Sequence, residues 1–233
     1  MISNLGYKIF LFLSLHKFII VVLNSNDEFV YKKETLTNNK SNQIDFNFLD
    51  NFLGENIFKI EKKLNEFVKN IFLIIEHQNI FPIYLSVKNK FGNIVINSNS
   101  INKLLSEAKN CCKITLENLD ILHMKIDRFY IDGTYFQTLP EKKNCKNLSI
   151  EISYICLPKK ISKNIEDVLG KYQISLDRML SSDYLGSFLD SKNDNLFTTA
   201  QKILNGFNEN EVHITDKNLK KLSFFERFFN FFN

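Results

Sequence analysis

The chain has 233 residues, with 30 Lys and Arg against 26 Asp and Glu and a formal net charge of +4. A chain of this length holds one large domain or two small ones, each with its own core. The basic residues are spread along the sequence without a concentrated stripe, which argues against a nucleic-acid partner.

The first apolar run covers residues 9–23 and is shorter than the about 20 apolar residues of a membrane-spanning helix. His16 and Lys17 lie at its centre, and no A-x-A cleavage site follows it, so a signal peptide is also disfavoured. We expect two strands joined by a tight turn at His16 and Lys17. A third strand is expected over residues 28–36, and the short spacing favours antiparallel pairing.

An amphipathic helix is expected over residues 56–70, after a polar loop over residues 37–43. Its buried face is predicted from the apolar residues at steps of three and four, namely Ile57, Ile60, Leu64, Phe67, Val68 and Ile71. The later predicted elements, in chain order, are strand 81–88, helix 101–111, strands 119–125, 129–132 and 148–157, helix 162–172, strand 174–179 and helix 183–189. Ser162 is the predicted N-cap of its helix. A short amphipathic piece over residues 197–207 comes before a polar linker.

The cysteines and histidines do not form a pattern that is typical of a metal or catalytic site. The four cysteines have no CxxC spacing and no nearby His pair, and they are Cys111, Cys112, Cys145 and Cys156. The four histidines are scattered, so no cysteine has a predicted base. We expect reduced, buried thiols, and we predict no metal site, no cofactor and no catalytic residue.

Residues 121–155, ILHMKIDRFYIDGTYFQTLPEKKNCKNLSIEISYI, carry the most specific spacing in the chain. The spaced residues are His123, Phe129, Asp132, Gly133, Pro140 and Leu148. This pattern resembles the inserted subdomain of FtsA, the actin-like protein of the bacterial division ring. Residues 150–189 then follow the family's order of elements. The chain departs from the family at Lys142 and Cys145, where the family has glycines, and at Asn147, where it has an arginine.

The resemblance implies an α+β fold. Its first part, residues 1–100, would be a partial actin-like subdomain with a three-stranded antiparallel start, a helix and a strand. The inserted α/β subdomain would span residues 101–180, followed by a short helical remainder over 181–207, a linker over 208–219 and a terminal amphipathic helix over 220–233.

The resemblance also implies that nucleotide binding is lost. The family's phosphate-binding hairpin reads D-x-G-T-S-K, and the best alignment places residues 12–17 against it, without the aspartate or the glycine. Bulky Phe12 and Leu15 cannot hold a cation or let a triphosphate approach the backbone. We expect a degenerate form that lacks the family's second nucleotide-binding half.

The last segment, residues 220–233, forms on a helix an apolar half and a polar half. The side chains expected to enter a membrane surface are Leu222, Phe224, Phe225, Phe228, Phe229, Phe231 and Phe232, and those expected near anionic headgroups are Lys220, Lys221 and Arg227. FtsA also ends in a linker and a membrane-targeting helix. The alternative is a final helix packed on the chain's own core.

These features favour a non-enzymatic adaptor of cell division, located on the cytoplasmic face of the cell membrane at the division site. The expected partners are the membrane surface, late division proteins and further copies of the chain. FtsZ binding stays open, because the family's docking site for it lies in the absent part. Protein contacts are expected around Asp132, Gly133 and Pro140, which otherwise form a plain turn. Two other functions also stay open, namely nucleotide binding at an unusual or partner-completed site and an adaptor role in pilus or secretion assembly.

Overall fold

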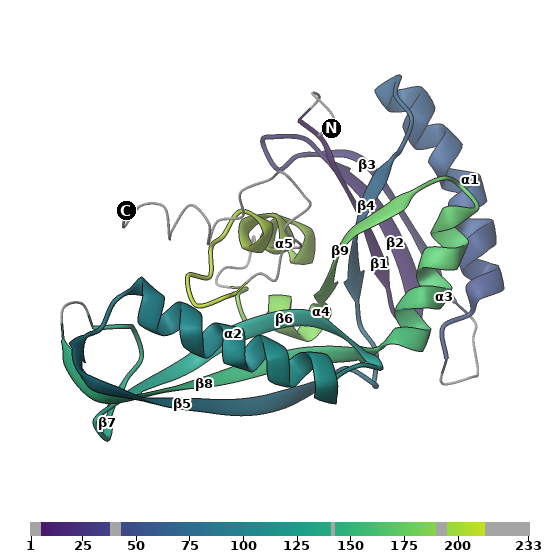
Figure 1. Ribbon diagram of the computed structural model, residues 1–233. Helices are drawn as coiled ribbons and strands as arrows, with labels where there is room; N and C mark the ends of the chain where they lie inside the picture. The colour runs from purple at the N-terminus through teal and green to yellow at the C-terminus, as the bar shows by residue number, and fades with distance from the viewer. Residues whose placement is uncertain (1–5, 38–42, 141–142, 190–194, 213–233) are drawn as a thin grey trace. The chain divides into compact units, whose positions relative to one another are not determined.

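The computed structural model describes residues 6–37, 43–140, 143–189 and 195–212 (Figure 1). The chain divides into two compact units. Unit 1 contains residues 1–80 and 157–204, and unit 2 contains residues 81–156 and 205–233. Unit 2 therefore interrupts unit 1 in the sequence, and the two units are described separately below.

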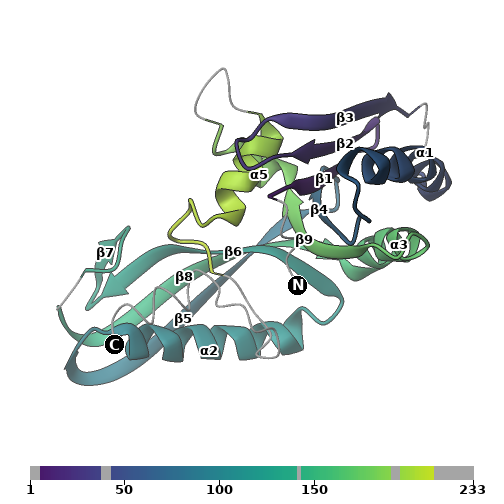
Figure 2. The same cartoon turned by 90° about the horizontal axis from the view of Figure 1, so that it is seen from above.

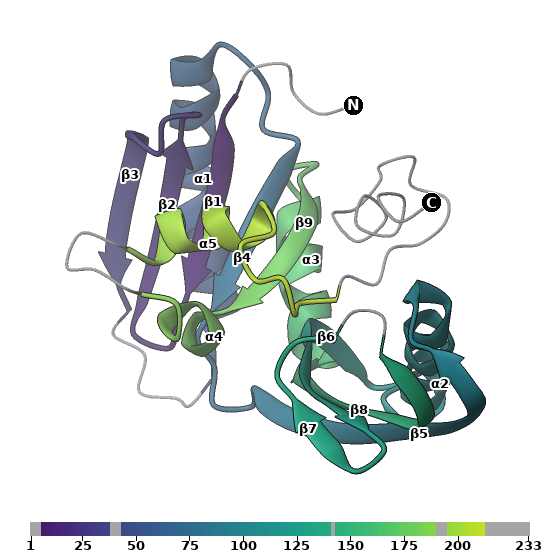
Figure 3. The ribbon, with the colours of Figure 1, turned by 90° about the vertical axis from the view of Figure 1, so that its left-hand side faces the viewer.

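A five-stranded mixed sheet forms the centre of unit 1. Its strands are β1 (Lys8–Leu13), β2 (Lys17–Leu23), β3 (Phe29–Leu36), β4 (Asn70–Ile75) and β9 (Ser175–Ser181). They lie in the order β3-β2-β1-β4-β9, with β1, β2 and β3 antiparallel and with β4 parallel to both β1 and β9 (Figure 3). The predicted α+β class with a three-stranded antiparallel start, a helix and a strand is confirmed.

Helices cover both faces of this sheet (Figure 2). On one face Phe18 of β2 packs against Phe48 and Phe52 of α1 (Phe46–Leu64), with ring centroids 5.5 and 6.1 Å away. On the other face Phe10 of β1 lies 6.3 Å from Phe197 of α5 (Leu196–Leu204). Strands buried on both faces are apolar throughout, which explains why the first hairpin has the hydropathy of a membrane segment.

The first helix differs from its prediction over residues 56–70. It starts ten residues earlier, because the Asp45 carboxylate caps it by accepting the N–H groups of Asn47 and Phe48, both at 3.0 Å. It ends at Asn65, whose φ of 53° is left-handed. The last three residues of the predicted buried face, Phe67, Val68 and Ile71, therefore lie beyond the helix.

The predicted helical face runs past the end of α1 into the next strand, β4. β4 is the continuous apolar run NIFLII, in which no alternation separates strand from helix. Ile71 is buried in this strand, whereas Phe67, predicted to be buried, is 78% exposed.

Three further predictions are wrong in detail. α3 (Lys159–Gly170) starts before the predicted N-cap Ser162, and the Ser162 hydroxyl instead donates to the Lys159 carbonyl at 2.9 Å. The strands predicted over 119–125 and 129–132 form one strand, β6 (Leu119–Ile131). α4 (Ser182–Gly186) is shorter than its predicted span of 183–189.

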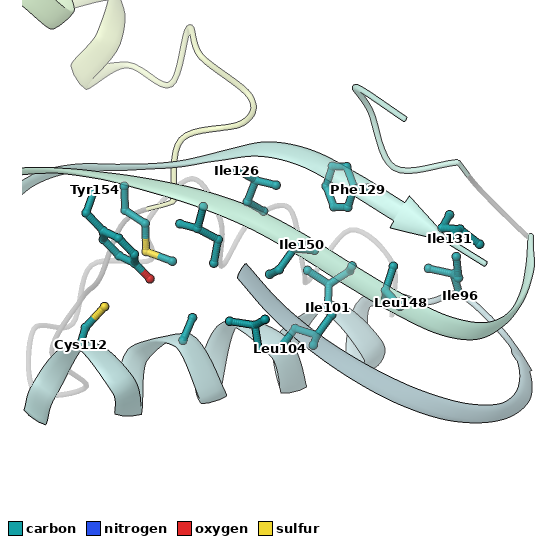
Figure 4. Packing of buried hydrophobic residues seen from close by; sticks show 14 of the residues in the cluster. Ile96, Ile101, Leu104, Cys112, Ile126, Phe129, Ile131, Leu148, Ile150 and Tyr154 are labelled. Carbon is teal, nitrogen blue, oxygen red and sulfur yellow. The ribbon is translucent and has the colours of Figure 1, made fainter. Parts of the chain in front are cut away.

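Unit 2 is a four-stranded sheet with one covering helix. The strands lie in the order β5-β8-β6-β7, and the remaining bounds are β5 (Phe81–Val95), α2 (Ser98–Thr115), β7 (Thr134–Phe136) and β8 (Asn144–Pro158). α2 packs Ile101 and Leu104 against the inward-facing side chains of the sheet, including Leu148 and Ile150 (Figure 4). This core also contains Cys112, Cys145 and Cys156, while Cys111 is exposed.

The observed boundary of unit 2 differs from the predicted inserted subdomain over 101–180. Unit 2 starts at Phe81, because β5 pairs along its length with β8, for example Leu85 with Ile152. α3 and β9, which were placed in the inserted subdomain, belong to unit 1.

Candidate functional site

The turn between β1 and β2 is held closed by Ser14. The Ser14 Oγ accepts the backbone N–H groups of His16 at 3.3 Å and Lys17 at 3.1 Å, and it donates to the Lys17 carbonyl at 3.2 Å. The backbone N–H of Ser14 donates to the same carbonyl at 3.0 Å. A phosphate site needs N–H groups that point at the ligand. Here the N–H groups of His16 and Lys17 are already satisfied inside the turn.

The neighbouring chain ties this turn down from outside. The backbone N–H of Thr37 donates to the His16 carbonyl at 2.8 Å, and the Thr37 hydroxyl donates to the Leu15 carbonyl. The side chain of Phe12 is buried, with the Lys17 ammonium 5.7 Å from its ring centroid. The first hairpin is therefore a packed structural element of unit 1.

Asp132 and Gly133 form the two-residue turn between β6 and β7. Ile131 pairs with Thr134, and the φ angles of Asp132 and Gly133 are 49° and 85°, as a type I′ turn requires. The Asp132 carboxylate accepts the backbone N–H groups of Asn147 at 2.8 Å and Lys146 at 3.1 Å. These two hydrogen bonds, that from Asn147 first, lower the pKa of Asp132 below its ordinary value.

The β6–β7 turn is thus fastened to the start of β8. Asp132 also donates its backbone N–H to the Asn147 carbonyl at 3.0 Å. The plain turn that was the alternative to a protein contact is present, and the Asp132 side chain holds it to β8. Pro140, the third residue predicted for protein contacts, is partly buried at the end of the described part of the following loop.

A cleft of about 840 Å³ lies on unit 2 beside this hairpin. Its lining side chains on β8, Glu151 and Ser153, alternate with Ile150, Ile152 and Tyr154, which belong to the core under α2. Since successive side chains of a strand point to opposite faces, the cleft occupies the face of the sheet away from α2.

Aromatic rings and ion pairs line this cleft. The Arg128 guanidinium lies 5.6 Å from the ring centroid of Tyr135, and its Nε is 3.8 Å from Oε2 of Glu151. Lys125 and Asp127 form a second pair at 2.9 Å. Tyr84 projects from β5 with 74% of its surface exposed. Tyr and Arg are enriched at the energetic centres of protein interfaces, so this composition suits the binding of a protein.

A buried polar pair, His123 with Glu211, could not be predicted from the sequence. His123 Nδ1 lies 2.8 Å from Glu211 Oε1, and both side chains are 1% exposed. Glu211 follows α5 and sits in a segment that pairs with β6 through two backbone hydrogen bonds, Ile126 N–H to Asn210 at 2.9 Å and Val212 N–H to Met124 at 2.7 Å. No local signal reveals the pair, because its members are 88 positions apart.

The start of the predicted linker over 208–219 is therefore docked on β6 through an isolated β-bridge. This segment leads directly into residues 213–233, which lie outside the described residues together with all the predicted membrane-binding side chains of 220–233. Within the described ranges, no helix combines the length and apolar character needed to cross a bilayer. The same ranges contain no group of three His, Cys, Asp or Glu side chains placed to hold a metal ion.

No protein-family model matches the chain, and no curated protein matches it. Among solved structures, it is similar to a PilM-PilN type IV pilus biogenesis complex at 9% identity and a TM-score of 0.44, covering 78% of this chain and 49% of that one.

Two other similar structures have lower scores. The cytoplasmic domain of EpsL, an inner membrane component of the type II secretion system of Vibrio cholerae, has 11% identity and a TM-score of 0.35, with 77% of this chain and 57% of that one covered. A Bacteroides thetaiotaomicron protein with an actin-like ATPase fold and unknown function has 16% identity and a TM-score of 0.32, with 81% and 58% covered. The chain spans about half the length of these structures.

Proposed function

We propose that the chain is a non-enzymatic adaptor that binds partner proteins at the cleft of unit 2 and holds them at a membrane surface through residues 220–233. The observation that carries this proposal is the turn closed by Ser14. Because its Oγ takes the backbone N–H groups of His16 and Lys17, those two donors are not available to a phosphate. An adaptor does not need a phosphate-binding site.

The composition of the cleft supports the binding half of the proposal. Arg128 stacked on Tyr135, with Glu151 beside it and Tyr84 standing free in solvent, offers rigid aromatic surface together with directed charges. Rigid rings lose little conformational entropy on binding, and the stacked guanidinium is already oriented.

Within this class, the spacing of His123, Asp132, Pro140 and Leu148 favours a division adaptor of the FtsA type. The second candidate, left open by the sequence, is an adaptor of pilus or secretion assembly, the processes in which two of the compared structures take part by their names. Both candidates need the same two surfaces, so the identity of the bound partner separates them.

Capture of purified partners tests the proposal. The tagged full chain would be offered the cytoplasmic parts of late division proteins and, in parallel, those of pilus and secretion proteins. We expect one class to be retained, and we expect Arg128→Ala combined with Tyr135→Ala to reduce retention at least tenfold. The matched control, Lys88→Ala, changes an exposed residue of β5 outside the cleft lining. Equal retention by the cleft variant and the control would contradict binding at the cleft.

A further inference from the structure

The outer face of α1 presents apolar surface to solvent near its C-terminal end. Phe58 is 70% exposed and Phe67, just beyond the helix, is 78% exposed, the two highest values for a phenylalanine among the described residues. The opposite face of α1 is buried through Leu49, Phe52, Leu53, Ile57 and Ile60. The helix therefore already has its core contacts, and Phe58 and Phe67 contribute nothing to them. Exposed apolar surface with a polar rim is typical of an interaction site.

Exposed lysines follow Phe58 along the helix. Lys59, Lys62 and Lys63 are all exposed on the same half of the helix. On a helical projection Lys62 lies about 40° and Lys59 about 100° from Phe58, whereas Lys63 lies about 140° away. Lys62 and Lys63 also lie in the last turn, where cations interact favourably with the helix dipole. That role accounts for two charges and leaves the exposed rings unexplained.

The acidic residues nearby reduce the positive charge without cancelling it. The Glu61 carboxylate accepts the backbone N–H of Val68 at 3.0 Å, so it is engaged in closing the helix end. Glu66 is partly buried, and Glu55 lies one turn before Lys59. Lys69 adds an exposed cation after the helix. From Phe58 onward the exposed charges are therefore mainly lysines.

We propose that the surface formed by Phe58, Phe67, Lys59 and Lys62, called the α1 patch, is a second membrane contact that binds anionic lipid headgroups. Lysine is depleted at protein interfaces and arginine and tyrosine are enriched there. The cations of the α1 patch are all lysines, whereas the cleft of unit 2 combines Arg128 with Tyr84 and Tyr135. Phenylalanine flanked by lysine is suited to the boundary of an anionic bilayer.

The sequence of the terminal segment provides the second argument. Residues 220–233 combine phenylalanines with Lys220, Lys221 and Arg227, which is the same chemistry. One weak membrane signal gives only reversible attachment, and stable attachment takes two. This inference rests on the proposed function. Residues 220–233 would be the first membrane signal, and the α1 patch would be the second.

Vesicle co-sedimentation of the full-length chain separates the two contacts. The vesicles would contain either phosphatidylcholine alone or phosphatidylcholine with a quarter of phosphatidylglycerol. The patch variant is Phe58→Ser plus Phe67→Ser, the tail variant is Phe228→Asp plus Phe229→Asp, and the control is Leu36→Ser plus Leu189→Ser, which removes other exposed apolar side chains. Circular dichroism checks that each variant keeps its fold.

We expect the patch variant to lower the partition coefficient on anionic vesicles about tenfold, with a much smaller change on neutral vesicles, and the control to behave as the wild type. A patch variant that pellets like the wild type on anionic vesicles overturns the inference, whatever the tail variant does. Loss of pelleting by the patch variant alone, with the tail variant unaffected, keeps the α1 patch and refutes attachment through residues 220–233. Loss of self-association by the patch variant in light scattering, with pelleting unchanged, assigns the patch to a second copy of the chain and also overturns the inference.

Discussion

At the scale of single residues, polar side chains in this protein mostly fasten backbone to backbone. Ser14 closes the first hairpin, Asp45 starts α1, and Asp132 ties the β6–β7 turn to β8. Each of these side chains accepts two neighbouring backbone N–H groups. A sequence motif that includes such a residue can therefore reflect a structural requirement, as Asp132 illustrates.

Replacing Asp132 by Asn tests this role. The hydrogen bonds from Asn147 and Lys146 lower the pKa of Asp132, so the carboxylate stabilises the folded state at every pH above the ordinary value of 3.8. That stability is lost as the pH falls through the lowered pKa of the folded state. We expect Asp132→Asn to reduce the melting temperature by a few degrees at pH 7 and by much less near pH 2.

Thermal unfolding followed by circular dichroism between pH 2 and pH 7 measures this difference. Asp167→Asn on the exposed side of α3 serves as the control. A deficit in Asp132→Asn that stays constant down to pH 2 would show that the carboxylate charge is not what holds the turn.

At the scale of elements, the structure joins segments that are distant in sequence. α1 is linked to the turn after α3 through Asp50, which accepts the Tyr172 hydroxyl at 2.8 Å on its carboxylate and at 2.7 Å on its backbone carbonyl. Lys171 donates to the same carboxylate at 2.6 Å. In unit 2, the segment around Glu211 is linked to β6 through His123. Neither link has a local sequence signal.

Tyr172→Phe removes the hydroxyl from the first of these links. We expect a loss of about 1 kcal/mol at neutral pH, the typical net contribution of a hydrogen bond. Burial and the bond to Asp50 raise the pKa of Tyr172 to about 12. A raised pKa means that the contribution of the hydroxyl to stability is complete below the ordinary pKa of 10.0 and is lost as the pH rises toward 12. The unfolding free energies of the wild type and of Tyr172→Phe should therefore converge at alkaline pH. Urea unfolding at pH 7 and pH 11 tests this, with Tyr84→Phe as the exposed control. An equal loss of unfolding free energy in Tyr172→Phe at both pH values would refute the prediction.

Separating the buried His123–Glu211 pair has a distinct energetic signature. Removing one member of a buried pair costs about 3–5 kcal/mol, whereas replacing both by apolar residues costs much less. We therefore expect Glu211→Leu and His123→Leu each to destabilise unit 2 more than the double variant does. Amide hydrogen exchange at residues 208–212 provides the readout, since those amides should exchange faster in both single variants. Additive effects in the double variant would indicate that the two side chains are not coupled.

At the scale of the whole molecule, periodicity predicted the order of elements better than their ends. The strands 8–13 and 17–23, with the turn between them, followed from a short apolar run interrupted by His16 and Lys17. The start of α1 was missed because the cap at Asp45 precedes the periodic residues, and β4 was missed because a strand buried on both faces shows no alternation.

The candidate site was predictable in outline only. The residues around Asp132 could be singled out from spacing, but the cleft formed by Tyr84, Arg128 and Glu151 requires three strands to be placed side by side. The exposure of Phe67 could not be predicted from the sequence either. Phe67 fits the apolar period, and only the left-handed Asn65 that ends the helix turns its side chain out of the core.

We propose that this protein works without a bound nucleotide. Isothermal titration calorimetry of the full chain with Mg-ATP tests this proposal. We predict no saturable binding at concentrations up to about 1 mM, because Ser14 already takes the backbone N–H groups of His16 and Lys17. A saturable isotherm that disappears in a Lys17→Ala variant would place a nucleotide at that hairpin and contradict the account.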